Sequence, residues 1–61
     1  MKQVQINDIK VAYIPYGDAI LIMESIDELG ISNGLIIPYH SIKDGVFTWH
    51  DKQYPIYFLD N

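Results

Sequence analysis

The sequence contains no cysteine and no arginine among its 61 residues. Without cysteine, neither a disulfide nor a thiolate-bound zinc ion can hold the chain together. A chain of this length is expected to form one domain, 1–61, which buries only about 60% of the surface that the unfolded chain exposes. Stability must therefore come from a dense apolar core or from self-association. The composition, 49% hydrophobic with eight aromatic residues, supports both routes.

Positive charge is also scarce, with four lysines against eight acids and a net charge of −4. Proteins that bind nucleic acids or anionic membranes make their phosphate contacts mainly through Lys and Arg. We therefore expect no direct contact with nucleic acid and no membrane association. The sequence has neither an N-terminal signal-like apolar run nor an apolar stretch of about 20 residues. Together with the lack of cysteine, this favours a cytoplasmic protein.

Residues 18–29 have the pattern of an amphipathic helix. Asp18 is a suitable N-cap, and Gly30 is a suitable residue just after the last turn. The apolar residues between them recur at helical spacing, namely Ala19, Ile22, Met23, Ile26 and Leu29. The start, the end and the spacing together predict a helix over about 18–29.

The rest of the chain has the alternation and the turns that are typical of strands. We expect 2–14 to be extended, either as a hairpin with a two-residue turn at Asn7-Asp8 or as one long bent strand. We expect further strands in the three later segments 35–37, 46–49 and 53–59. Turns at 43–45 and 50–52 precede the last two strands, which are expected to form a hairpin. Pro55 cannot donate a hydrogen bond, so the last strand should lie at an edge, or the proline should face outward. The predicted fold is α+β, with one short helix packed on an antiparallel sheet of four to five strands.

A second interpretation replaces the helix with a hairpin. In it, 10–14 pair with 19–23 across the turn Pro15–Asp18, and Ser25–Glu28 form a capping box that opens a single helical turn. That arrangement is a small five-stranded β-barrel resembling an SH3 or Sm fold. Runs of isoleucine leave the choice between helix and strand open.

The sequence shows no catalytic or metal-binding signature. Ser41 directly follows His40, but adjacent residues rarely form a nucleophile and base, and nothing marks a carboxylate to orient the histidine. His40 and His50, even with a neighbouring aspartate, do not have a recognised metal-ligand spacing. We therefore expect no enzymatic activity, no cofactor and no metal.

The negative charge lies in residues 11–42, which contain four acids, Asp18, Glu24, Asp27 and Glu28, and no lysine. On a helix the last three share one face, where they repel one another and oppose the helix dipole. A locally unfavourable choice without an evident gain is expected at functional sites. These acids are therefore one predicted partner-binding surface, and a solvated face that keeps the protein soluble is the alternative.

Trp49 and Tyr57 are the second predicted partner-binding surface. The last strand is apolar on both sides, so one side should be core while the other can anchor a partner. The alternative is that the aromatic residues only fill a small core. In the helical interpretation Ala19–Met23 is apolar all round, and this favours a homodimer that covers it.

The leading functional hypothesis is a non-enzymatic protein–protein interaction domain that docks its acidic helix face on a basic, nucleic-acid-handling protein and inhibits or modulates it. In size, acidity and lack of arginine the chain resembles small accessory proteins of phages and mobile elements, some of which act in this way. No motif carries that resemblance. The alternative hypothesis is a structural or self-assembling subunit of a larger complex that binds through an aromatic sheet face.

Overall fold

Short hairpins organise the chain, of which a computed structural model describes residues 2–59. Within this range there are seven strands: β1 (Gln3–Ile6), β2 (Ile9–Tyr16), β3 (Ala19–Ile22), β4 (Ile36–Pro38), β5 (Ile42–Lys43), β6 (Val46–Trp49) and β7 (Lys52–Phe58). Two single turns of 3-10 helix interrupt them: η1 (Asp27–Leu29) and η2 (Tyr39–Ser41). The described residues contain no α-helix.

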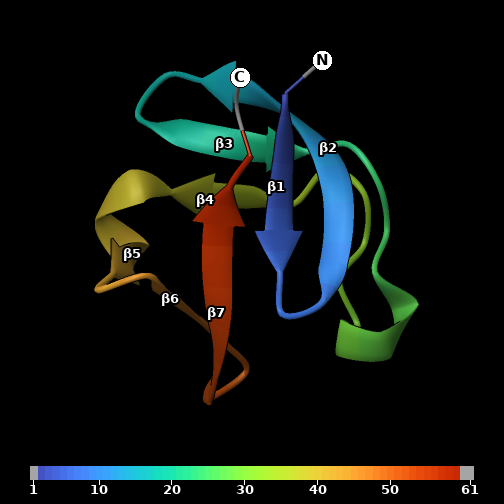
Figure 1. Ribbon diagram of the computed structural model, residues 1–61. Helices are drawn as coiled ribbons and strands as arrows, with labels where there is room; N and C mark the ends of the chain where they lie inside the picture. The colour runs from blue at the N-terminus through green and yellow to red at the C-terminus, as the bar shows by residue number, and fades with distance from the viewer. Residues whose placement is uncertain (1, 60–61) are drawn as a thin grey trace.

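The seven strands lie in the order β4-β3-β2-β1-β7-β6-β5, and all neighbours are antiparallel. The end strands β4 and β5 are joined by η2, so the sheet curls into a nearly closed barrel. Figure 1 shows β1 and β7 side by side at the front, with β3 running crosswise to them.

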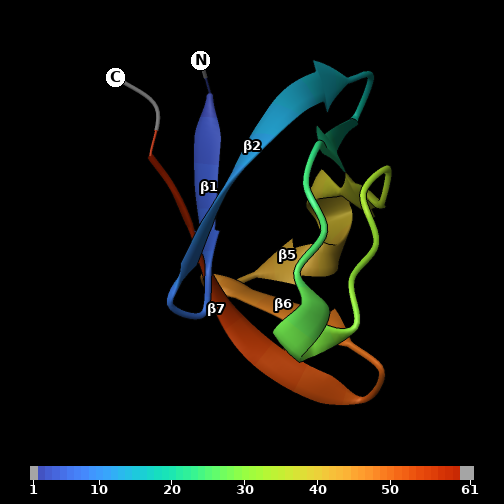
Figure 2. The same cartoon turned by 90° about the vertical axis from the view of Figure 1, so that its right-hand side faces the viewer.

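Strand β2 belongs to both halves of the barrel. Its first half, Ile9 to Ala12, pairs with β1, and its second half, Tyr13 to Tyr16, pairs with β3. Figure 2 shows β2 sweeping from its place beside β1 toward β3. One long bent strand therefore connects the two parts of the sheet and encloses the core between them.

The core consists mainly of isoleucines that alternate with outward residues. Its buried members are Val4, Ile6, Val11, Tyr13, Ile20, Ile22, Ile26, Ile31, Ile37, Phe47 and Ile56. β-Branched side chains suit a pleated surface that is covered on one side. No polar or charged residue within 2–59 is buried, so the interior carries no obvious chemistry.

Ile26 and Ile31 close one end of the barrel. Their backbones exchange two hydrogen bonds, from the Ile26 N–H to the Ile31 carbonyl at 2.7 Å and in the reverse direction at 3.0 Å. Both side chains are only 2% exposed. The turn η1 projects between them and returns through Gly30, whose φ of 69° is strained for other residues.

The predicted α+β fold, with a helix over about 18–29, is wrong. Residues 19–22 form β3, in which Ile20 and Ile22 face the core while Leu21 faces outward. Gly17, with a φ of 59°, lets the chain reverse between β2 and β3. The spacing of the apolar residues fits both the helical repeat of about 3.6 residues and the strand repeat of two. The segment is a strand because it pairs with β2 on one side and with β4 on the other.

The second interpretation, a small barrel of SH3 or Sm kind, fits the structure. A hairpin of β2 and β3 does form, but it pairs residues 13–16 with 19–22 across Gly17-Asp18. The proposed hairpin paired 10–14 with 19–23, so its register was wrong. The barrel has seven strands, however, rather than five. The expected capping box is absent, since Ile26 occupies the N-cap of η1 and makes no side-chain cap.

The expected turns before β2 and before β6 are confirmed. Ile6 pairs with Ile9 across Asn7-Asp8, where Asn7 has a φ of 58°. Asp44 and Gly45 both have positive φ between β5 and β6. Such turns match the twist of the strands that they join, and Asn, Asp and Gly tolerate them best.

Pro55 faces outward, and β7 is not an edge strand. It lies between β1 and β6, and Pro55 stands opposite Asn7, one position beyond the last pair of the β1–β7 ladder, Ile6 with Ile56. The Pro55 carbonyl accepts the Asn7 N–H at 2.8 Å. Since proline cannot return this bond, the Asn7 carbonyl accepts Nε2 of Gln5 instead, at 3.1 Å.

Adjacent positions on β7 test the inward and outward assignment. Ile56→Ala should lower the free energy of unfolding by about 2–5 kcal/mol, because Ile56 is buried in the core. Tyr57→Ala should change it by less than about 1 kcal/mol, because Tyr57 is 56% exposed. Urea unfolding measures both values, and equal losses would contradict the assignment.

Candidate functional site

Glu24 is held by the backbone of the barrel. One oxygen of its carboxylate accepts the Ala12 N–H at 2.8 Å. The Met23 N–H donates to the Ala12 carbonyl at 2.9 Å, so Glu24 supplies the second bond of a pair in which a backbone carbonyl would normally accept. This acid therefore extends the β2–β3 ladder by one bond.

The other predicted acids do not form one surface with Glu24. Asp27 and Glu28 are exposed in the turn η1, and Asp18 lies in the turn at the opposite end of β3. The Asp18 carbonyl accepts the Tyr39 N–H at 2.9 Å. Because no helix is present, the shared face that was expected for Glu24, Asp27 and Glu28 does not exist. Figure 2 shows η1 at the same end of the barrel as the β6–β7 turn.

Trp49 is anchored in the barrel wall. Its indole Nε1 donates to the Leu29 carbonyl at 2.9 Å and so ties β6 to η1. The indole ring stacks on the Phe47 ring with 6.1 Å between ring centroids. It also makes an edge contact with the His50 ring, whose centroid is 4.4 Å away. Trp49 packs against the core, and its polar group is already used.

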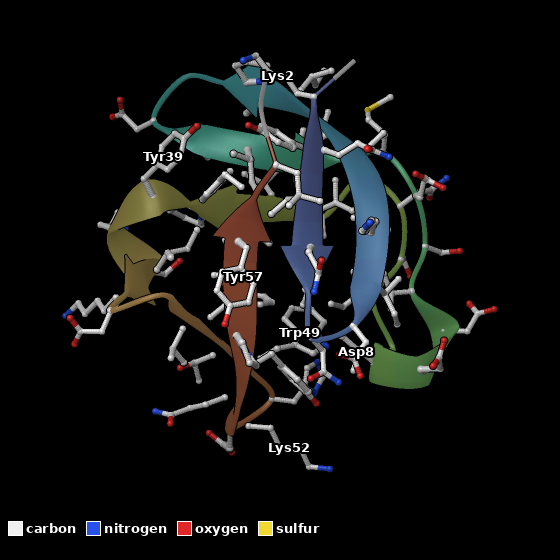
Figure 3. The ribbon with its side chains drawn as sticks, viewed as in Figure 1. Lys2, Asp8, Tyr39, Trp49, Lys52 and Tyr57 are labelled. Carbon is white, nitrogen blue, oxygen red and sulfur yellow. The ribbon has the colours of Figure 1, made fainter. Side chains whose placement is uncertain are left out.

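Tyr57 projects from the opposite side of the sheet. It pairs with Gln5 on the outer side of β7, whereas Trp49 lies on the core side of β6. Figure 3 shows Tyr57 in front of β7 and Trp49 lower in the view. The structure therefore does not bring Trp49 and Tyr57 onto one binding surface.

A shallow pocket of about 250 Å³ lies beside Trp49. Its lining residues are Glu28, Leu29, Gly30, Trp49, His50, Lys52 and Tyr54. Its lining includes no serine or threonine, and its lysine and glutamate are both exposed. The pocket brings two predicted residues, Glu28 and Trp49, to one place.

A second hollow, of about 320 Å³, is lined by polar side chains that include Ser41, Lys43 and Asp44. The Ser41 hydroxyl donates to the Pro38 carbonyl at 2.7 Å. Ser41 therefore completes the turn η2. Across residues 2–59, no three His, Cys, Asp or Glu side chains are grouped so that they could hold a metal ion. The same stretch has no helix of the length and hydropathy needed to cross a membrane.

The outer side of β3, β4 and the part of β2 from Ala12 onward is apolar across all three strands. Cross-strand partners share a face, so the register places Ile14, Leu21 and Ile36 in one row and Tyr16, Ala19 and Pro38 in the next. Met23 lies opposite Ala12 at the end of the same face. We call this surface the apolar face; its members are Ala12, Ile14, Tyr16, Ala19, Leu21, Met23, Ile36 and Pro38.

Half of the apolar face is open to solvent. Its most accessible side chains are Ile14 (44% exposed), Ile36 (45%), Met23 (48%) and Tyr16 (54%). No member carries a charge. The remaining outer surface differs, since β1 presents Gln3 and Gln5 there. The sequence signal for this face is a set of consecutive apolar residues within strands, which makes both sides of a strand apolar.

Comparison with protein-family models, with curated proteins and with solved structures gives no match for this chain. The fold and the site therefore rest on the geometry described above. That geometry offers three candidates: the pocket beside Trp49, the polar hollow at Ser41 and the apolar face. Only the apolar face is large, uncharged and uncovered.

Substitution of Glu24 tests whether its carboxylate stabilises the barrel through the Ala12 hydrogen bond or is needed for its negative charge. Glu24→Ala should lower the free energy of unfolding by about 1 kcal/mol, because the Ala12 N–H loses its acceptor. Glu24→Gln should retain more than half of that contribution, since its amide oxygen can still accept. Urea unfolding measures the difference, and an equal loss in both variants would show that the negative charge itself is needed.

The turn between β6 and β7 is strained. His50 and Asp51 have φ of 51° and 65°, a conformation that glycine adopts more easily. Asp51→Gly should therefore raise the free energy of unfolding by about 0.5–1 kcal/mol. Asp8→Gly is the control, because Asp8 does not have positive φ. Thermal unfolding compares the two, and a less stable Asp51→Gly protein would contradict this assignment.

Proposed function

We propose that this chain is a non-enzymatic protein–protein interaction domain of the cytoplasm that binds another protein chain through the apolar face. The observation that carries the proposal is the apolar face itself, which has uncharged side chains from β2, β3 and β4 in neighbouring rows. Four of these side chains remain about half exposed in the isolated chain. The buried core lies on the other side of the same strands and does not need them.

The size of the apolar face supports this function. Its four most exposed side chains together present roughly 400 Å² of mainly apolar surface. The largest apolar patch on a typical monomer is about 300–600 Å² and is often functional, so the apolar face is the part of this surface where a binding site is expected. Ile14, Leu21 and Ile36 form its centre, and Tyr16 adds an aromatic side chain of a type that often anchors interfaces.

The alternatives have weaker support from the geometry. The pocket beside Trp49 is small, and its tryptophan N–H is already bonded to Leu29. The hypothesis of docking on a basic, nucleic-acid-handling protein stays a prediction, with Asp27 and Glu28 as its adjacent exposed acids. Glu24 is bonded within the barrel and Asp18 is remote, so this acidic surface is smaller than the sequence indicated.

Photo-crosslinking tests the proposed function with a matched pair of tyrosines. A benzophenone side chain would replace Tyr16 on the apolar face or Tyr57 outside it, which are 54% and 56% exposed. The tagged protein is produced in its native cells and irradiated there. We expect an adduct of defined mass from position 16 and none from position 57.

The two positions have similar exposure, so a difference between them reports the place of the side chain and not its accessibility. No adduct from position 16, or the same adducts from both positions, would contradict the proposal. Far-UV circular dichroism of both substituted proteins controls for retention of the barrel.

A further inference from the structure

The free edge of β4 is poorly suited to pairing with another strand. Pro38 has no N–H to donate, and its carbonyl already accepts the Ser41 hydroxyl at 2.7 Å. Ile37 is paired with Ile20 of β3, on the side of β4 away from the free edge. Proteins commonly protect edge strands in this way. A partner of this barrel is therefore expected to pack on the apolar face and not to extend the sheet.

The dimensions of the apolar face fit an interface between two small domains. Stable protein interfaces bury about 800 Å² on each partner, with an apolar centre and a polar rim. The roughly 400 Å² of exposed side chains on this face could supply the centre, and the surrounding turns the rim. Two sheets that pack face to face lie about 10 Å apart, with their side chains interdigitated.

The charges around the face are arranged so that it can complement itself. Lys10 and Asp18 are four residues before and four residues after Ile14. Lys10 and Ile14 are four residues apart on β2, so both lie on its outer side. Asp18 lies in the turn that follows the strand. A two-fold axis near Ile14 that lies in the plane of the interface and runs perpendicular to β2 reverses the strand direction, and it would therefore direct Lys10 of each copy toward Asp18 of the other.

We infer that the occupant of the apolar face is a second copy of this chain, packed face to face about a two-fold axis near Ile14. This inference rests on the proposed function and names its partner. The uncharged centre brings no like charges together, although each copy has a net charge of −4. A 61-residue chain without disulfides also gains stability from such association.

Sedimentation velocity across about 5–500 µM protein tests the dimer, because this range brackets micromolar dissociation constants. We expect the native chain to sediment as a dimer at the upper end. Ile14→Lys should raise the dissociation constant at least about 30-fold, since it places a charge at the centre of the interface. Tyr57→Lys, outside the face, should leave the dissociation constant within about two-fold.

A charge exchange tests the two-fold arrangement. Lys10→Asp alone and Asp18→Lys alone should each raise the dissociation constant about 10-fold, because each change affects two symmetry-related pairs. The double variant should return to within about three-fold of the native value. If the double variant dissociates as readily as the single variants, the arrangement about Ile14 is overturned.

The outcomes separate this inference from the proposed function. A native chain that stays monomeric at the highest concentration overturns the inference, as does equal dissociation of Ile14→Lys and Tyr57→Lys. If that monomer still forms an adduct with a different protein from position 16, the face binds another protein and the proposed function stands. Without such an adduct, both fail.

Discussion

The barrel depends on the pairing of β2 with two different strands. Its first half is bonded to β1 and its second half to β3, so the strand must bend where the partners change. This bend brings the inner residues Val11 and Tyr13 over the same core as Ile20 and Ile22. Every further strand is added at one side of this unit or the other, until β4 and β5 nearly meet.

The same pairing explains why an apolar surface remains outside. A strand in the middle of a sheet has two faces, and the barrel covers only one of them. The outer residues of β2, β3 and β4 are apolar as well, so the fold buries Ile20, Ile22 and Ile37 and leaves Ile14 and Ile36 exposed. A closed core and an open apolar face thus arise from the same three strands.

Much of the strand pattern could be predicted from the sequence. Turns such as Asn7-Asp8 and Asp44-Gly45 have strong local signals and formed as expected, although the short strand β5 before Asp44 was not predicted. The helix over 18–29 was wrong, because apolar residues at 19, 22, 23 and 26 fit helical spacing while those at 20 and 22 also fit a strand. The end signal at Gly30 was correct, but it closes the single turn η1.

The candidate site was harder to predict, because it depends on long-range pairing. Glu24 looked like part of an acidic helix face, and only its distance to the Ala12 N–H shows its role in the ladder. Trp49 and Tyr57 were both recognised as notable, but the register of β6 and β7 places them on opposite sides. The apolar face joins three segments that no local pattern connects.

The most direct test of this account is the NMR contact between β2 and β3. Tyr13 and Ile22 form a pair without mutual hydrogen bonds, whose Cα atoms should lie only about 4.5 Å apart. The account predicts a strong nuclear Overhauser effect between the Hα atoms of these two residues. Its absence, together with sequential amide-to-amide contacts through residues 19–23, would show a helix and contradict both the barrel and its apolar face.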